Sequence, residues 1–254
     1  MKKVTMNQLL KNPSGPNTAY FSRRDLIIDN LTDRFFKIIK KHPKIDYEIY
    51  DKDDSYYFFI KFPSEKYNKL KYDVVLEFSP ASELSSNDFT LNNYNLRLFS
   101  NSPNFIFSYT YVYNQDKIII DFLKDKINDK ALNDPPEKKN PLQSYGFEKS
   151  VYFAMLFIKH FKLHVKSNIM SKSKPLKKKE LLKSISSSDD KMKEYNRIKN
   201  NQVSKRKTQK TVAKKTKNSY NGDREIQKGR TSQNKKSLGK RDMKHNMKVN
   251  KKKG

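Results

Sequence analysis

The chain has 254 residues, with 55 Lys and Arg against 27 Asp and Glu, a net charge of +28 and no Cys. The lack of Cys excludes disulfides, thiolate metal sites and a cysteine nucleophile. The chain starts without an apolar run long enough for a signal peptide, and its longest apolar run, residues 151–158, is far short of the roughly 20 residues of a membrane span. We therefore expect a soluble intracellular or particle-associated protein, with no membrane partner.

Charge and aromatic residues divide at about residue 165. Residues 1–165 carry 25 basic and 20 acidic residues, whereas residues 166–254 carry 30 basic and 7 acidic residues. Of the 31 Phe and Tyr residues, only Tyr195 and Tyr220 lie beyond residue 165. A packed core needs apolar area to offset the chain entropy lost on folding. The sequence therefore predicts an N-terminal arm (1–21), a globular domain (22–165) and a lysine-rich, mostly disordered tail (166–254).

The first half of the predicted domain reads as one helix followed by three strands. The arm before it contains Pro and Gly, with one turn of helix expected at residues 6–10. Apolar residues then recur at three- and four-residue spacing between residues 22 and 41, which indicates an amphipathic helix. Alternating apolar residues predict strands at residues 45–50, 56–62 and 72–78, the first two forming a hairpin.

Residues 94–113 have the pattern of two more strands joined by the turn sequence SNSPN. In the second strand, five aromatic residues would share one face: Phe105, Phe107, Tyr109, Tyr111 and Tyr113. Such a face is either part of a core or a platform on which bases stack. We favour the core, because two amphipathic helices need a sheet face to cover.

The rest of the predicted domain is mainly helical. Residues 116–127 fit either a strand or a helix, and we favour the helix. A proline-rich segment follows, and then a largely buried helix at residues 146–165. Past residue 165, short helices could form with a faint apolar stripe made of Leu176, Leu181, Leu182 and Ile185. The fold class predicted is α+β: an antiparallel sheet of four to six strands, packed on one face by two or three helices.

Motifs of catalysis are sparse. Only Gly15 and Gly146 lie in the first 165 residues, so neither a dinucleotide-binding glycine turn nor a P-loop is present. His160 and His164 would share a helix face, but no third ligand is evident and lysines surround them. We expect no enzyme, no metal and no cofactor.

Carboxylates on strands are the alternative that would make the protein a metal-dependent nuclease. Asp73 and Glu77 lie on one predicted strand, and Asp46 and Glu48 on another. A two-metal site needs carboxylates that converge from neighbouring elements, usually with a lysine close by. Since Glu77 is followed by Phe and Ser and not by such a lysine, we interpret these residues as a solvated strand face.

The cationic tail carries the strongest functional signal. Lysines and arginines release counterions from nucleic acid and give salt-sensitive binding that does not depend on sequence. Because Lys outnumbers Arg in the tail, contacts with phosphate are favoured over reading of base edges. The expected nucleic-acid contacts are the basic clusters Lys177, Lys178, Lys179, Lys205, Arg206, Lys207, Lys214, Lys215, Lys235, Lys236, Lys240, Arg241, Lys251, Lys252 and Lys253.

Four phrases resemble a family of proteins from tailed bacteriophages of low-GC Gram-positive hosts: NPSGPNTAYFSRRDLI, YDVVLEF, FSNSPNFIFSYTYVYN and YGFEKSVYFA. The resemblance covers residues 12–165 and implies a role in virion structure or assembly, without a catalytic motif. Together with the charge, it leads us to expect a non-enzymatic virion-associated or assembly protein whose tail binds nucleic acid, with DNA favoured. Other virion proteins or further copies of the chain are possible partners, and the expected location is the virion or the host cytoplasm. The alternative is a stand-alone DNA- or RNA-binding protein outside any particle.

Overall fold

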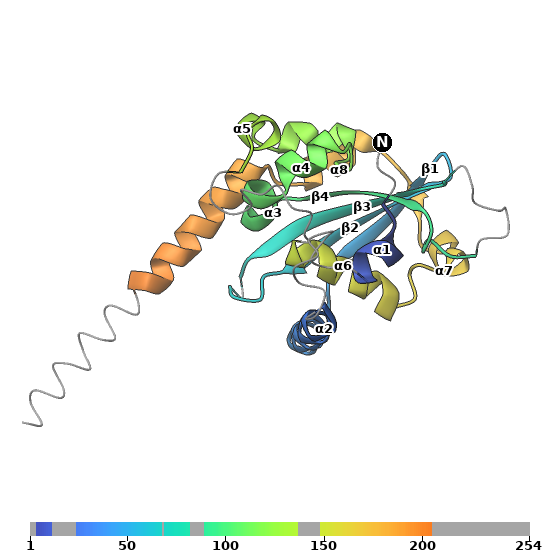
Figure 1. Ribbon diagram of the computed structural model, residues 1–254, viewed down its shortest axis with the longest axis horizontal. Coiled ribbons are helices and arrows are strands. Elements are labelled where there is room, and N and C mark those ends of the chain that lie inside the picture. The colour runs from blue at the N-terminus through green and yellow to red at the C-terminus, as the bar shows by residue number, and fades with distance from the viewer. Residues whose placement is uncertain (1–3, 12–23, 68, 82–88, 137–147, 205–254) are drawn as a thin grey trace, which may run out of the picture. The chain divides into compact units, whose positions relative to one another are not determined.

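The computed structural model describes residues 4–11, 24–67, 69–81, 89–136 and 148–204 (Figure 1). The chain divides into two compact units, residues 1–197 and residues 198–254. The first unit contains the sheet. In the second, the structure describes residues 198–204, which are helical. Twelve of the fifteen predicted nucleic-acid contacts, those from Lys205 onward, lie outside the described residues.

A five-stranded sheet in the order β4-β3-β2-β1-β5 forms the centre of the first unit. The strands are β1 (Tyr47–Lys52), β2 (Ser55–Pro63), β3 (Lys71–Ser79), β4 (Asn95–Ser100) and β5 (Lys174–Pro175). The first four strands form an antiparallel meander, and β5 pairs with β1 in parallel. The prediction of an α+β fold built on an antiparallel sheet is therefore confirmed.

The β1–β2 hairpin closes through two aspartates. Lys52 pairs with Ser55, so Asp53 and Asp54 alone form the loop, with φ angles of 50° and 59°. Two-residue hairpin loops favour positive φ at both positions, because the twist of such a turn matches that of the strands. Asp tolerates this conformation better than most residues do, so the turn forms without the Asn-Gly pair that usually marks it.

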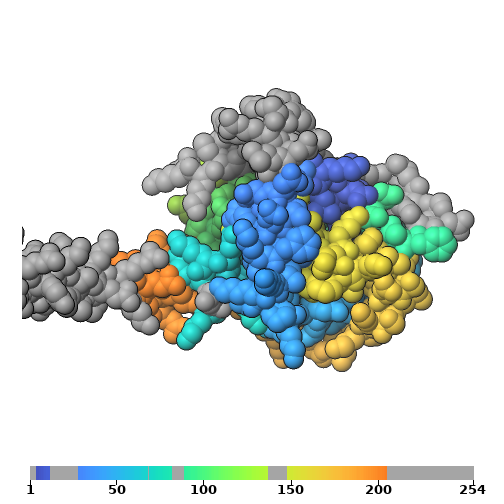
Figure 2. Space-filling view, turned by 90° about the horizontal axis from the view of Figure 1, so that it is seen from below, coloured from blue at the N-terminus to red at the C-terminus, as the bar shows by residue number. Residues whose placement is uncertain are grey.

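One face of the sheet is covered by α6 (Lys149–His160), with α1 (Met6–Lys11) and α2 (Arg24–Lys41) packed against it (Figures 1 and 2). On α6, the ring of Phe153 lies 5.8 Å from that of Phe62, and the ring of Phe157 lies 5.4 Å from that of Tyr47. Met6 of α1 is fully buried. The short helix expected in the N-terminal arm is therefore part of the core.

The opposite face of the sheet is also covered, so the expectation of helices on one face only is wrong. It packs against the 3₁₀ helix η2 (Asp121–Lys126). The helix α8 (Lys178–Ser184) lies next to η2, with Lys178 Nζ 5.2 Å from the centre of the Phe122 ring. The ring of Phe122 lies 6.0 Å from that of Tyr57, and Leu181 is fully buried. The physical reason lies in β2 and β3, whose central residues are buried on both faces.

The expected strand over residues 105–113 is a pair of short helices, α3 (Pro103–Ser108) and α4 (Thr110–Gln115). Ser102 caps the first one: its Oγ accepts a hydrogen bond from the backbone N–H of Phe105 at 3.1 Å. Pro103 occupies the first helical position, where its missing N–H costs nothing. The sequence SNSPN is thus a helix start, not a hairpin turn.

Residues 116–127 combine the two alternatives considered for them. Ile119 forms a parallel bridge with Leu98 of β4, and η2 follows directly. α5 (Asp129–Asn133) comes next. The helix favoured from the sequence is therefore replaced by a short extended piece and a short, tight 3₁₀ helix.

Compact structure continues past residue 165, where the sequence predicts that the domain ends. It includes α7 (Lys166–Met170), β5, α8 and the start of a helix over residues 188–204. Ile169, Leu181 and Ile185 all belong to the hydrophobic core. All of these elements except the last are short and show at most a faint apolar stripe, so the sequence pattern places the boundary too early.

Candidate nucleic-acid interface

A lysine-rich segment lies on the folded surface of the first unit. We call residues 172–183, which include β5 and most of α8, the basic strap. It contains six lysines and one acidic residue, Glu180. The lysines are Lys172, Lys174, Lys177, Lys178, Lys179 and Lys183, and all six are exposed.

Backbone pairing and apolar anchors hold the strap against the sheet. Lys174 pairs with Tyr50 of β1, and the N–H of Leu176 donates to the carbonyl of Asp51 at 2.9 Å. Leu181 and, just beyond the strap, Ile185 are buried in the core. The lysines therefore project from a segment whose backbone is fixed, which lowers the entropy lost when they bind a partner.

A second hydrogen-bond network fixes the chain just after the strap. Asp73 of β3 accepts a hydrogen bond from the N–H of Ser186 at 2.9 Å and another from Nδ2 of Asn101 at 2.8 Å. The N–H of Asp73 in turn donates to Oδ1 of Asn101 at 2.9 Å. Asp73 is only 3% exposed, so this carboxylate finds its hydrogen-bond donors inside the protein.

Two of the six strap lysines interact closely with neighbouring side chains. Lys177 Nζ forms an ion pair with Glu180 at 3.2 Å, and Lys178 Nζ lies 5.2 Å from the centre of the Phe122 ring. The other four form no ion pair with any residue that the structure describes: Lys172, Lys174, Lys179 and Lys183. Exposed ammonium groups of this kind are suited to contact phosphate as point charges.

Three of the predicted contact residues, Lys177, Lys178 and Lys179, lie in the strap. The expectation that they belong to a disordered tail is wrong, and Lys172, Lys174 and Lys183 beside them were not among the predicted contacts. The available signal was the apolar stripe of Leu176, Leu181 and Ile185, which separates the lysines and anchors their backbone. This part of the candidate interface is therefore a fixed surface and not a tail.

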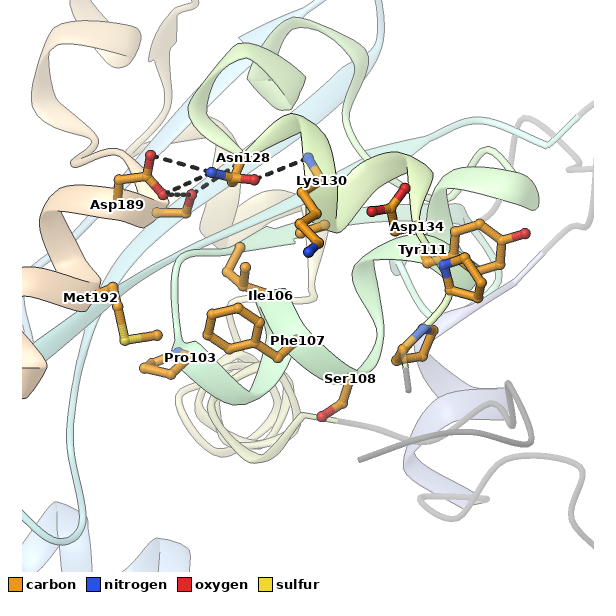
Figure 3. Close-up of a pocket in the computed structure, with 14 residues that line it drawn as sticks. Pro103, Ile106, Phe107, Ser108, Tyr111, Asn128, Lys130, Asp134, Asp189 and Met192 are labelled. Atoms are coloured by element: carbon orange, nitrogen blue, oxygen red, sulfur yellow. Dashed lines mark hydrogen bonds between the residues drawn. The ribbon is translucent and has the colours of Figure 1, made fainter. Parts of the chain in front are cut away.

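The five aromatic residues between 105 and 113 are divided between core and surface. Four of them lie on α3 or α4, and Tyr109 lies at the junction between these two helices. Phe105 and Tyr113 are buried and their ring centres lie 5.9 Å apart, while the partly buried Tyr109 stacks on Tyr113, also at 5.9 Å. Phe107 is 50% exposed and, together with Tyr111, lines a surface pocket (Figure 3). The core interpretation therefore holds for Phe105 and Tyr113, whereas Phe107 lies at the surface.

The carboxylates considered for a nuclease site do not converge. Asp73 belongs to the network with Asn101, and Glu77, also 3% exposed, is bound by Arg97. Asp46 forms an ion pair with Lys71 at 2.7 Å, and Glu48 accepts a hydrogen bond from the Tyr50 hydroxyl. The expectation of a solvated strand face is wrong for Asp73 and Glu77, which are buried and paired.

His160 and His164, which were expected on one helix face, do not share a face in the structure. α6 ends at His160, and Lys162 adopts a φ of 54°, which turns the chain before His164. His160 packs among the rings of Phe35, Phe36 and Phe161. Burial lowers the pKa of His164.

Among the described residues, no cluster of three His, Asp or Glu side chains could hold a metal ion. No helix in the described part of the chain is long and apolar enough to cross a membrane.

Comparisons with known proteins add no information on this site. No family model, no curated protein and no solved structure matches this chain.

Proposed function

We propose that this chain is a non-enzymatic nucleic-acid-binding protein that contacts the phosphate backbone through its basic strap and its lysine-rich C-terminal residues. One observation carries the proposal: residues 166–254 contain 30 basic and 7 acidic residues. Each neutralised phosphate releases counterions, so such a charge excess favours tight binding that weakens steeply with salt. We propose DNA as the partner, because a virion-associated or assembly protein would contact packaged or replicating DNA.

The same resemblance supports a place in a phage particle or in its assembly. The runner-up is a stand-alone DNA- or RNA-binding protein, which the charge alone would equally support. Mass spectrometry of purified particles separates the two. A virion-associated protein is present at constant stoichiometry, and its absence from particles would leave only the runner-up.

A deletion that starts at residue 166 is a poor test of binding, because it would remove β5 and the buried Leu181. The better design keeps residues 1–204 intact and removes only residues 205–254. Binding to random-sequence duplex DNA is then measured across a salt series. We expect the truncated protein to bind more weakly and to show a shallower slope of log K against log salt. The slope should decrease in magnitude by about 0.9 for each phosphate contact that is lost with residues 205–254.

The strap is tested separately in the full-length chain. We expect a variant with Lys172, Lys174, Lys179 and Lys183 replaced by Gln to show a shallower slope in the same assay. The matched control replaces four exposed lysines elsewhere on the fold: Lys37, Lys40, Lys44 and Lys69. Both variants lose the same net charge. If they weaken binding equally, the strap has no special role and only the overall charge matters.

A further inference from the structure

The pocket lined by Phe107 and Tyr111 has the size of a recognition site. Its volume is about 520 Å³, within the range of pockets that enclose a ligand or an anchoring side chain. Its walls come from α3, α4, the region around α5 and the start of the helix at residues 188–204. In Figure 3, Phe107 lies at the middle of the pocket, with Met192 to one side and Tyr111 to the other.

The pocket combines an apolar lining with an acidic rim. Ile106, Phe107 and Met192 supply apolar surface, while the polar rim carries two carboxylates and one ammonium group, those of Asp134, Asp189 and Lys130. Asp189 accepts long hydrogen bonds from Asn128 at 3.3 and 3.4 Å, but neither carboxylate forms an ion pair with a described residue. Such a pocket is complementary to an apolar side chain surrounded by cations.

A surface of that kind exists on the same protein. Phe89 is 76% exposed and Met170 is 71% exposed. Lys166 connects them: its N–H donates to the carbonyl of Phe89 at 2.9 Å, and Met170 follows one helical turn later on α7. Lys162, four residues before Lys166, is exposed, whereas Lys166 is partly buried, with its Nζ 5.1 Å from the centre of the Tyr94 ring. We call Phe89 and Met170, with these two lysines, the basic knob.

The knob and the pocket cannot meet within one molecule. Figure 1 shows α7 at one end of the sheet, whereas α3 and α5 lie toward the other end. Two different surfaces on one chain that complement each other create a heterologous contact, which continues from copy to copy. We propose that the pocket receives the basic knob of a second copy of this chain, so that copies associate head to tail.

The two sides have complementary shape and charge. Large exposed apolar side chains on one copy would leave water on entering the apolar pocket of the next. Lys162 and Lys166 around the knob would lie near the carboxylates of Asp134 and Asp189. Among the described residues that line the pocket, Lys130 is the only cation and opposes this pairing. The contact therefore relies on the apolar insertion as well as on charge.

Sedimentation velocity of nuclease-treated, nucleic-acid-free protein across a concentration series tests the proposal. The pocket variant is Phe107→Ser and the knob variant is Phe89→Ser with Met170→Ser. Each is expected to weaken association on the order of thirtyfold, as loss of an interface hot spot does. The control is Phe36→Ser on α2. The Phe36 side chain is 47% exposed, a fraction similar to that of Phe107, and it belongs to neither the pocket nor the knob. It should associate like the unmodified chain.

A mixture of the pocket variant and the knob variant gives the decisive result. The pocket variant keeps an intact knob and the knob variant keeps an intact pocket, so one interface per pair remains. At a concentration where each weakened variant alone is monomeric, we expect the mixture to form a 1:1 dimer and nothing larger. An unmodified chain that remains monomeric, a mixture that forms no dimer, or a Phe36→Ser variant as impaired as Phe107→Ser would each overturn the proposal. Because nucleic acid is absent, these outcomes are independent of whether the chain binds DNA.

Discussion

Arg97 binds the carboxylate of Glu77 through two parallel hydrogen bonds, from Nε to Oε2 at 2.9 Å and from Nη2 to Oε1 at 2.8 Å. The hydroxyl of Tyr57 donates to the same Oε1 at 3.0 Å. Glu77 lies in the middle of the sheet and is 3% exposed. A charge in that position is stable only while its partner remains, because an unpaired buried carboxylate loses its hydration without compensation.

Arg97→Met should therefore destabilise the protein by about 3–5 kcal/mol, the usual cost of breaking a buried ion pair. The measurement is urea denaturation. Arg34→Met is the matched control, because its ion pair with Glu65 joins side chains that are 36% and 30% exposed. That control should cost no more than about 1 kcal/mol. Equal losses for the two variants would contradict the buried role of Glu77.

Glu65 should account for part of the loss of folding stability at low pH. A hydrogen bond from Arg34, helped by Lys149, lowers the pKa of Glu65 from 4.5 to about 2. A carboxyl group whose pKa is lower in the folded state stabilises the fold above its unfolded pKa and loses that contribution as the pH falls through its folded pKa. The melting temperature of the unmodified chain should therefore fall more than that of Glu65→Gln between pH 4.5 and about pH 2. Parallel melting curves across this window would exclude the linkage.

Leu181→Ala should show that residues beyond 165 help to hold the fold together. The side chain is fully buried, and shortening a buried leucine to alanine costs about 2–5 kcal/mol. The neighbouring Leu182 is only partly buried, so Leu182→Ala should cost clearly less. Urea denaturation compares them. If both changes were nearly neutral, α8 would not be a stable part of the domain.

The aromatic residues of α3 should separate into two groups. Phe105 is fully buried, so Phe105→Ala should cost about 3–5 kcal/mol. Phe107 is half exposed, and Phe107→Ala should change stability by roughly 0.5 kcal/mol, as surface substitutions do. Thermal or urea unfolding gives both values. A similar loss at the two positions would mean that residues 103–108 are not helical.

The central meander could be predicted from the sequence because its strands are long and bounded by polar breaks. The segment at residues 105–113 could not, since aromatic residues at every second position also place 105, 109 and 113 on one helical face. The information that decides between the two is local: a Ser followed by a Pro starts a helix. The sequence indicated helical segments near η2 and α8, but it could not show that they cover the second face of the sheet, because the face that a short helix covers is decided by tertiary packing.

The charge of the candidate interface could be predicted from the sequence, but its location on the folded surface could not. Lysine content identified Lys177, Lys178 and Lys179, but it could not tell a tail from a surface segment. The distinction depends on Leu176 and Leu181, whose burial is a tertiary property. The pocket around Phe107 was not predictable, because its walls come from segments that are far apart in the sequence.

Other parts of the described chain pair with both edges of the sheet, along part of each edge strand. On the β4 side, the N–H of Leu96 donates to the carbonyl of Val4 at 2.7 Å, and that of Leu98 donates to the carbonyl of Ile118 at 2.8 Å. On the β1 side, β5 is two residues long and ends in Pro175, which has no N–H to offer. Within the described residues, the sheet therefore presents no long unpaired strand that another polypeptide could extend. A protein at high local concentration gains from this, because the described strands give neighbouring copies little free backbone edge on which a cross-β aggregate could grow.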